Sequence, residues 1–304
     1  MTQQERVDIT FGTSAEYVIH VAAVIASIVK NAPGANLRFI LLHAPMPDEL
    51  KRNVEKSAPN ATFFWNEVGD DDLPAYADRR HFTRAILFRL SAEKLAPADC
   101  KRVIYLDADL IVCGDIRKLW EIDLGGAPIG AVKDAYMQGA PFAEEWKLPP
   151  GPYDYFNSGV LLIDLEKVRT EKLFTKTIDF VARHSETLKF ADQCALNYVF
   201  WSRWKPLPPT WNAHRDMVVP WKVKNLPPAM QFDNRLPAIV HYTEEDKPWI
   251  RTAYHPWSWL YWKYLKRSAF LKTVSDQAGM NEFDRFKLWV RWLRRKPSST
   301  VATV

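Results

Sequence analysis

Two short apolar runs joined by an acidic tripeptide constrain the fold of this chain more than any other part of its sequence. The runs are Val103–Leu106 and Leu110–Val112, and the tripeptide between them is Asp107-Ala108-Asp109. Short, uniformly apolar runs are typical of a strand that is buried on both faces of a parallel sheet. In an open α/β sheet, ligands bind beyond the carboxyl ends of the strands. The tripeptide therefore stands where a ligand site is expected.

The two carboxylates of the tripeptide need a positive charge nearby, because acids one residue apart repel each other. Mg²⁺ and Mn²⁺ take carboxylate oxygens as ligands and commonly also bind the phosphate oxygens of a substrate. Asp107 and Asp109 thus predict a metal ion that bridges the protein to a diphosphate. The alternative is a polar strand end with two solvated acids. The tripeptide alone does not decide between them, since short motifs recur by chance.

Segments with strand and helix character alternate from residue 7 to about 113. We expect strands at Val7–Gly12, Leu37–Leu42 and Ala61–Trp65, and helices at Tyr17–Lys30, Asp48–Ser57 and Thr83–Leu95. This alternation predicts right-handed βαβ units and a parallel sheet, hence an α/β fold. Asp48 is expected to cap the second helix.

The rest of the chain continues this pattern less regularly. We expect strands at Ile129–Lys133, Val160–Ile163 and Leu236–Val240, and helices at Thr170–Arg183 and Gln193–Phe200. After Trp201 the proline-rich stretch PLPPTWN indicates loops over the sheet. A chain of 304 residues has room for one large α/β domain or two smaller ones.

Several classes of protein are disfavoured by what the sequence lacks. There is no Gly-x-Gly-x-x-Gly after the first expected strand and no P-loop motif, which argues against dinucleotide-binding proteins and the usual NTPases. Cys100, Cys113 and Cys194 are odd in number and lack Cys-x-x-Cys spacing. We therefore expect buried thiols in a reducing compartment. The amino terminus has no signal core, and Tyr17–Val29 is shorter than the about 20 residues of a membrane span. We expect a cytoplasmic protein.

Positive charge gathers at the carboxyl end. The net charge is +5, yet the residues from Lys247 onward carry twelve Lys and Arg against three acids, which leaves the rest of the chain at −4. In Asn281–Lys296, apolar and aromatic residues fall on one helical face and basic residues on the other, the pattern of an interfacial helix. We predict that this helix lies on the inner face of an anionic cell membrane. The alternative is that the apolar face packs on the protein body. A net negative body disfavours a nucleic-acid partner.

Polar residues near the expected strand ends each admit two explanations. Arg89 is either solvated or directed at a phosphate, and Asn157 either closes a turn or serves a site. Asp192 most simply caps a helix. His241 and Lys247, six residues apart beyond an expected strand, are either structural or supply a metal ligand and a phosphate contact.

Four segments together resemble glycosyltransferase family 8, and most closely its bacterial lipopolysaccharide galactosyl- and glucosyltransferases. They are YLDADLIV, FNSGVLLIDL, ADQCALN, and HYTEEDKPW followed by HPWSWLYWKYLK, in the family's order and spacing. The resemblance covers residues 7 to about 265 and implies a single Rossmann-like domain of the GT-A type, which we place at 1–267. We expect the basic amphipathic remainder, 268–304, to be an extension of that domain. The resemblance further implies a retaining, Mn²⁺- or Mg²⁺-dependent transfer of glucose or galactose from a UDP-sugar. The implied acceptor is a saccharide or glycolipid such as lipopolysaccharide.

The resemblance also gives roles to residues by position in its motifs. The residues that match the metal ligands are Asp107, Asp109 and His241, and the one that matches the diphosphate-binding lysine is Lys247. Those that match the surroundings of the transferred sugar are Arg89, Asp134, Asn157, Asp192 and Gln193. Those that match the nucleotide-binding residues are Phe11, Gly12, Thr13, Tyr17 and Ala108. Retention fits front-face attack, with a phosphate oxygen taking the acceptor proton, or double displacement with Asp192 or Gln193 as nucleophile.

Three positions depart from the family's pattern. Ser14 and Glu16 stand where Asp and Asn are usual, and Glu244 stands where Gly is usual, followed by Glu245 and Asp246. Three acids beside a diphosphate are unfavourable unless they point away or meet a cation. The alternative function is therefore a catalytically impaired protein that binds a nucleotide-sugar or glycan on the same scaffold.

Overall fold

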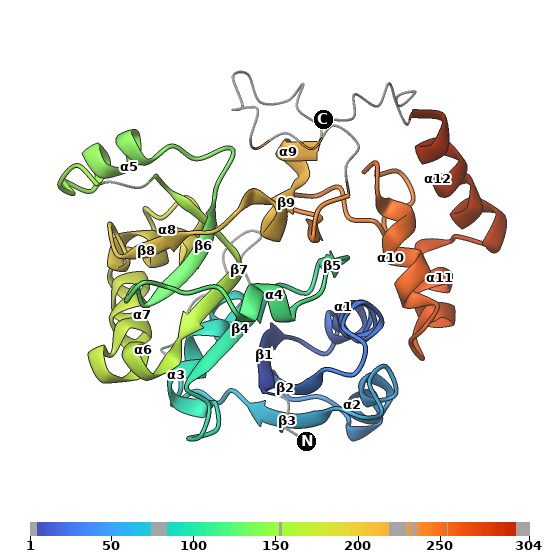
Figure 1. Ribbon diagram of the computed structural model, residues 1–304, viewed down its shortest axis with the longest axis horizontal. Coiled ribbons are helices and arrows are strands. Elements are labelled where there is room, and N and C mark those ends of the chain that lie inside the picture. The colour runs from blue at the N-terminus through green and yellow to red at the C-terminus, as the bar shows by residue number, and fades with distance from the viewer. Residues whose placement is uncertain are drawn as a thin grey trace.

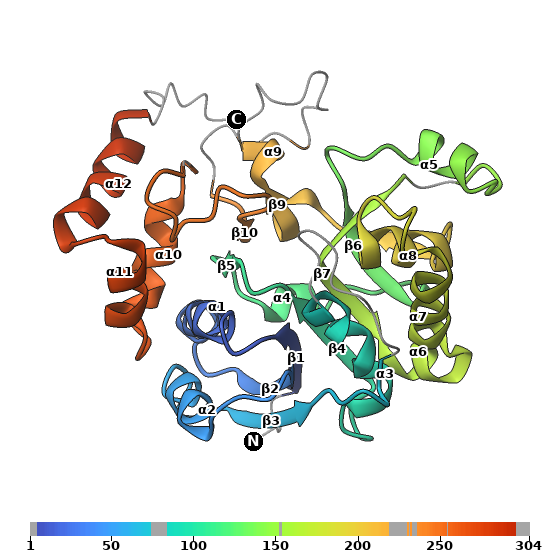
Figure 2. The same cartoon turned by 180° about the vertical axis from the view of Figure 1, so that it is seen from behind.

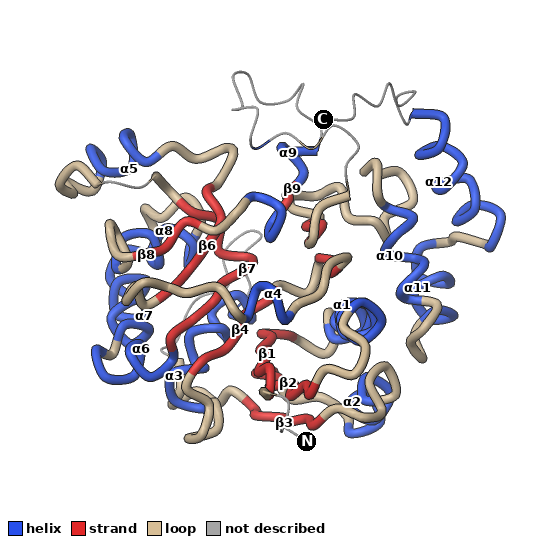
Figure 3. The backbone as a smooth tube through the Cα atoms, in the orientation of Figure 1, coloured by secondary structure: helices blue, strands red, loops and turns tan. Residues whose placement is uncertain are grey.

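A twisted main sheet crosses the middle of the molecule (Figures 1 and 3). The computed structural model describes residues 5–73, 84–151, 154–218, 230, 232, 236–253 and 255–295. Within these ranges the main sheet has seven strands in the order β3-β2-β1-β4-β7-β6-β8. They are β1 (Arg6–Thr13), β2 (Asn36–His43), β3 (Thr62–Glu67), β4 (Arg102–Leu106), β6 (Ile129–Lys133), β7 (Phe156–Asp164) and β8 (Trp204–Pro206).

The first half of this sheet is parallel, as the strand–helix alternation predicts. β1 pairs in parallel with β2 and β4, and β2 with β3. β6 and β8 are also parallel, whereas β7 runs antiparallel to both of its neighbours. The predicted α/β fold with a mostly parallel sheet is confirmed. Because Leu106 pairs with Val160, the reversal of β7 brings its first residues to the carboxyl end of β4.

The two apolar runs that flank the acidic tripeptide belong to different sheets. The second run forms β5 (Leu110–Val112), which pairs antiparallel with β10 (Ile239–His241). β10 in turn pairs in parallel with β9 (Ala213–His214). Placing the second run in the parallel sheet was therefore wrong, and the tripeptide is the crossing from one sheet to the other.

Helices cover the main sheet on both faces (Figures 1 and 2). On one side α1 (Val18–Asn31) packs against β5 and α10 (Ser258–Leu265). The other face carries the 3₁₀ segment η1 (Arg84–Ser91), α3 (Ala92–Leu95), α6 (Leu165–Glu171), α7 (Leu173–His184) and α8 (Ala191–Val199). Each side has its own apolar core, with Ile9 in one and Ile40 in the other. The remaining elements are α2 (Asp48–Glu55), α4 (Arg117–Trp120), α5 (Gly139–Glu145), η2 (Pro209–Asn212), α9 (Arg215–Val218), α11 (Leu271–Ala278) and α12 (Glu282–Arg295).

Three expectations about the helices differ from the structure. The expected helix 83–95 is mostly the 3₁₀ segment η1, with one α-helical turn at its end, and Thr83 lies outside the described residues. Pro47, not Asp48, occupies the N-cap position of α2, so the Asp48 carboxylate instead lies in the first turn, where the helix dipole favours it. Asp192 lies in the first turn of α8 rather than at its cap, and its carboxylate pairs with Arg89.

Helix α12 packs on the body through one part of its surface. Trp292 lies against Trp259 of α10, with ring centroids 5.0 Å apart, and Arg285 donates to Ser275 Oγ at 2.8 Å. Phe283 and Phe286 are 63% and 52% exposed, and Trp289 and Leu293 are exposed as well. The body thus leaves these side chains of the predicted aromatic face largely uncovered. Within the described ranges, no helix is both long and apolar enough to cross a bilayer.

A buried ion pair ties the edges of β1 and β2 together. Arg38 of β2 binds Asp8 of β1 through two contacts of 2.6 and 2.8 Å, and both side chains are at most 5% exposed. Arg6 and Asp99 extend the network at the surface. Removing either partner of a buried ion pair leaves the other charge buried and unpaired, which lowers the free energy of unfolding.

Arg38→Met is expected to lower the free energy of unfolding by about 3–5 kcal/mol, because it leaves Asp8 buried without its main partner. The matched control is Arg6→Met, which removes a partly exposed arginine from the same carboxylate and is expected to cost less than about 1 kcal/mol. Urea unfolding followed by circular dichroism measures both. Equal costs for the two variants would contradict the assignment.

Candidate functional site

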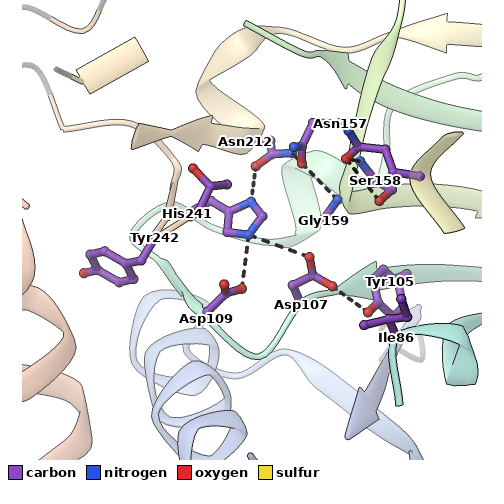
Figure 4. Close-up of polar contacts among 12 residues, drawn as sticks. Ile86, Tyr105, Asp107, Asp109, Asn157, Ser158, Gly159, Asn212, His241 and Tyr242 are labelled. Carbon is purple, nitrogen blue, oxygen red and sulfur yellow. Dashed lines mark hydrogen bonds and ion pairs between the residues drawn. The ribbon is translucent and has the colours of Figure 1, made fainter. Parts of the chain in front are cut away.

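Asp107, Asp109 and His241 meet where the main sheet and the small sheet join. One ligand atom from each lies within 4.8 Å of the others. His241 Nε2 is 3.1 Å from Asp109 Oδ1 and 3.7 Å from Asp107 Oδ2 (Figure 4). Two carboxylate oxygens and one imidazole nitrogen form a donor set that suits Mn²⁺ and, less strongly, Mg²⁺. The residues present therefore fit the predicted metal ion.

Asp107 is oriented by its neighbours so that one oxygen faces this cluster. Its Oδ1 accepts hydrogen bonds from Tyr105 Oη at 2.6 Å and from Arg89 Nη2 at 3.0 Å. Burial raises the pKa of Tyr105 well above its ordinary value, so its hydroxyl stays a donor. With Oδ1 occupied, Oδ2 is the oxygen that faces His241.

The positive charge beside Asp109 comes from Lys247, whereas Asp107 is paired with Arg89. Lys247 Nζ lies 2.5 Å from Asp109 Oδ2 and also donates to Tyr242 O at 2.7 Å. Burial would raise the pKa of Asp109, but its contacts with Lys247 and His241 outweigh burial and hold that pKa well below the usual range. Asp109 is therefore an ionised carboxylate, as a metal ligand must be.

The loop that carries Lys247 is anchored by aromatic contacts. Trp249, two residues on, stacks on His20 of α1 with ring centroids 3.7 Å apart, and His20 Nδ1 lies 2.6 Å from Tyr261 Oη of α10. Burial lowers the pKa of His20 to about 3, so the stacked ring is uncharged near neutral pH. This packing holds Lys247 beside Asp109.

A glycine at position 159 leaves room for the cluster. A Cβ atom on Gly159 would lie 2.1 Å from His241 Cε1 and 2.7 Å from Asp107 Oδ2. Gly159 also accepts the backbone N–H of Asp107 at 2.9 Å. Close approach of β7 to the carboxylates thus requires a residue without a side chain.

The residues expected around the sugar lie together beside the cluster. Asp134 Oδ2 accepts hydrogen bonds from Asn157 Nδ2 at 3.1 Å and Gln193 Nε2 at 3.3 Å. Arg89 donates to Ser158 O at 2.6 Å, and its Nε lies 2.8 Å from Asp192 Oδ2. Burial raises the pKa of the Asp192 carboxyl, and the positive charge of Arg89 opposes that shift without cancelling it.

A cleft of about 620 Å³ opens next to Asp107 and Asp109. Of the residues expected to bind the nucleotide, those that line it are Gly12, Thr13, Tyr17 and Ala108. Ser14 and Glu16 line it too. Phe11 is placed differently, since its side chain is fully buried and packs on Phe39 in the core beneath the cleft.

Arg215, which sequence reasoning missed, explains two of the three acids after His241. Its buried guanidinium pairs with Asp246 and lies 3.5 Å from Glu244. Glu244 has φ of +66°, a conformation that favours glycine. The cation required by this acidic stretch is thus present, which removes the main argument for an impaired protein. Tyr105 and Asn212 were missed as well, because one lies within a buried strand and the other within the proline-rich loops.

Comparisons with known proteins identify one family and several similar proteins. The model of the family described as "Glycosyl transferase family 8" matches residues 8–253. General stress protein A of Bacillus subtilis is 29% identical over 91% of this chain and 99% of its own length. Lipopolysaccharide 1,2-glucosyltransferase of Escherichia coli K12 is 28% identical over 83% of this chain and 75% of its own.

Solved structures share the fold. The galactosyltransferase LgtC, determined with donor and acceptor sugar analogues, superimposes with a TM-score of 0.74 at 24% identity, over 86% of this chain and 96% of that chain. The bifunctional glycosyltransferase WbbM superimposes with a TM-score of 0.73 at 20% identity, over 91% of this chain and 52% of that chain.

Gly159→Ala is expected to abolish Mn²⁺ binding, because the added methyl group displaces His241 or Asp107, and overpacking should cost about 1–3 kcal/mol of stability. Electron paramagnetic resonance of free Mn²⁺ measures the binding. The control is Gly69→Ala, whose Cβ would come no closer than 3.6 Å to another atom. Wild-type affinity in Gly159→Ala would show that β7 does not approach the cluster this closely.

Proposed function

Because the chain belongs to glycosyltransferase family 8, we propose that it transfers glucose or galactose from a UDP-sugar to a saccharide acceptor, with a divalent metal ion and with retention of anomeric configuration. The observation that carries the proposal is that Asp107, Asp109 and His241 lie close together, with Lys247 beside Asp109 and a cleft next to both carboxylates. A solvated pair of acids would need neither a shared imidazole nor a partly buried lysine.

The departing UDP gains negative charge as the bond to the sugar breaks, and the site concentrates positive charge there. A Mn²⁺ or Mg²⁺ ion held by Asp107, Asp109 and His241 would supply Lewis-acid stabilisation of that charge. Lys247 is already positioned beside Asp109, so its ammonium group would bind a diphosphate oxygen with little rearrangement. Gly12, Thr13, Ala108 and the exposed Tyr17 would hold the nucleotide in the cleft.

The hydrogen bonds among the residues expected around the sugar favour front-face attack over double displacement. Gln193 Oε1, the candidate nucleophilic atom, already accepts from Ser158 N at 3.0 Å and Ser158 Oγ at 3.3 Å. Asp192 is held in an ion pair with Arg89. Asp134, with Asn157 and Gln193 on one of its oxygens, would instead orient sugar hydroxyls. An oxygen of the leaving phosphate then takes the acceptor proton.

The acceptor we propose is a lipopolysaccharide core or another glycolipid. It is supported by the names of relatives such as the E. coli lipopolysaccharide 1,2-glucosyltransferase. The enzyme would then work in the cytoplasm, on the inner face of the cell membrane. The division at residue 267 between catalytic domain and extension stays a prediction.

Helix α12 would provide the attachment to that membrane. Its exposed aromatic residues Phe283 and Phe286 border a groove of about 820 Å³ that Lys263, Lys266 and Arg285 also line. Aromatic side chains can enter the interface while the basic groups contact anionic headgroups, each worth about 1 kcal/mol. Attachment would raise the local concentration of a membrane-bound acceptor.

Asp107→Asn and Asp109→Asn are each expected to abolish Mn²⁺-dependent UDP binding, because each removes a charged metal ligand. Neither should unfold the protein, because each also removes the repulsion between the two acids in the metal-free site. His241→Ala should weaken binding less. Isothermal titration of UDP with and without Mn²⁺ measures this, beside hydrolysis of UDP-glucose, UDP-galactose and UDP-N-acetylglucosamine. The control is Asp115→Asn, which alters a carboxylate paired with Arg117 outside the site. Full turnover by Asp109→Asn with the metal chelated would refute metal dependence.

Phe286→Ser is expected to weaken binding to anionic vesicles about tenfold, since burial of a Phe side chain is worth about 1.5–3 kcal/mol. Co-sedimentation with vesicles that contain phosphatidylglycerol measures it. The control Phe64→Ser changes another exposed phenylalanine, on β3, and should have no effect. Equal partitioning of wild type and Phe286→Ser would rule this face out.

A further inference from the structure

Asn212 is a fully buried amide between the metal-ligand cluster and the sugar side of the site. It ends η2, just before β9, and Figure 4 shows it between His241 and Asn157. Its Oδ1 lies 2.9 Å from His241 Nδ1, and its Nδ2 lies 2.8 Å from Asn157 Oδ1. Neither the family match nor the sequence motifs gave it a role.

The orientation of this amide follows from a backbone donor. Gly159 N donates to Asn157 at 3.0 Å, and a backbone N–H can only donate, so the atom of Asn157 that faces it is the oxygen. The atom of Asn212 that shares this oxygen must then be its NH₂ group. Oδ1 of Asn212 is therefore the atom that faces His241.

An acceptor beside Nδ1 fixes the state of the imidazole. His241 Nδ1 must carry a proton to donate to Asn212 Oδ1. Nε2 faces Asp107 and lies 3.1 Å from Asp109 Oδ1. With the proton held on Nδ1, Nε2 is the nitrogen that would offer its lone pair to a metal ion bound between these carboxylates. We infer that Asn212 is the positioning residue that holds His241 in the tautomer able to ligate the metal. The metal-binding part of this inference rests on the proposed function.

The other end of the amide reaches the sugar side. Asn157, which accepts from Asn212, donates its own NH₂ group to Asp134 Oδ2 at 3.1 Å. Gln193 donates to the same oxygen. One buried side chain thus orients a metal ligand through its oxygen and the sugar-side residues through its nitrogen. Substitutions of Asn212 can remove one of these two contacts while keeping the other.

Two near-isosteric variants make this separation. Asn212→Asp keeps an acceptor for His241 but loses the donor to Asn157. Asn212→Leu loses both. Mn²⁺ affinity should stay within about threefold of wild type in Asn212→Asp and fall about 10–100-fold in Asn212→Leu, the range typical of losing an outer-sphere partner. Sugar transfer or donor hydrolysis should fall in both. The matched control is Asn31→Leu, which removes a part-buried amide bonded to Val112 O and Tyr264 Oη.

The tautomer itself provides a readout that does not depend on metal or activity. Long-range ¹H–¹⁵N spectra of the imidazole should show Nδ1–H for His241 in the wild type and in Asn212→Asp, and a shift toward the other tautomer in Asn212→Leu. Spectra of His241→Gln assign the signal. Asn212→Ala replaces Asn212→Leu if the latter does not fold.

Two results would overturn the inference. One is an unchanged His241 tautomer in Asn212→Leu, and the other is equal loss of Mn²⁺ affinity in the Asp and Leu variants. If the wild type binds no Mn²⁺ with UDP, the proposed function fails, while the spectra still decide whether Asn212 sets the tautomer.

Discussion

The repulsion between Asp107 and Asp109 is the constraint on which the rest of the site depends. Two ionised carboxylates a residue apart are tolerated because each has its own cation: Arg89 for the first and Lys247 for the second. These cations come from opposite faces of the main sheet, one from η1 and one from the loop after β10. His241 lies between the two acids. The layers that cover the sheet therefore position the charges that make the site stable.

Buried strands were predictable from sequence because uniform apolar runs have few other uses. The parallel order of the first strands followed from their alternation with helices, and the four segments that resemble the family contain most of the candidate site residues. Local geometry could be predicted less well from the sequence. Nothing in a run of apolar residues distinguishes β4 from β5, although they pair in different sheets. Propensity for helix also did not reveal that η1 is wound as a 3₁₀ helix.

The residues that escaped prediction share a physical reason. Tyr105 has the appearance of an ordinary strand residue, and Asn212 and Arg215 stand in or after the irregular stretch PLPPTWN. Asn212 and Arg215 act on partners distant in sequence, His241 and Glu244, and Tyr105 acts on Asp107, which is two residues away but lies beyond the end of β4. Periodicity carries information about neighbours on the same element and none about such contacts. Polar residues that orient other polar residues are therefore visible only once the fold is known.

The crossing of the chain between two sheets at Asp107–Asp109 has a thermodynamic consequence. A cation bound there would contact residues at the end of β4, the start of β5 and the end of β10 at once, so it would bind the assembled sheets and not the unfolded chain. By mass action, occupancy at 100 times the dissociation constant would add about 2.7 kcal/mol to the free energy of unfolding. Folding and metal binding would then be coupled equilibria, so a low concentration of the ion would make the contact between the two sheets less stable.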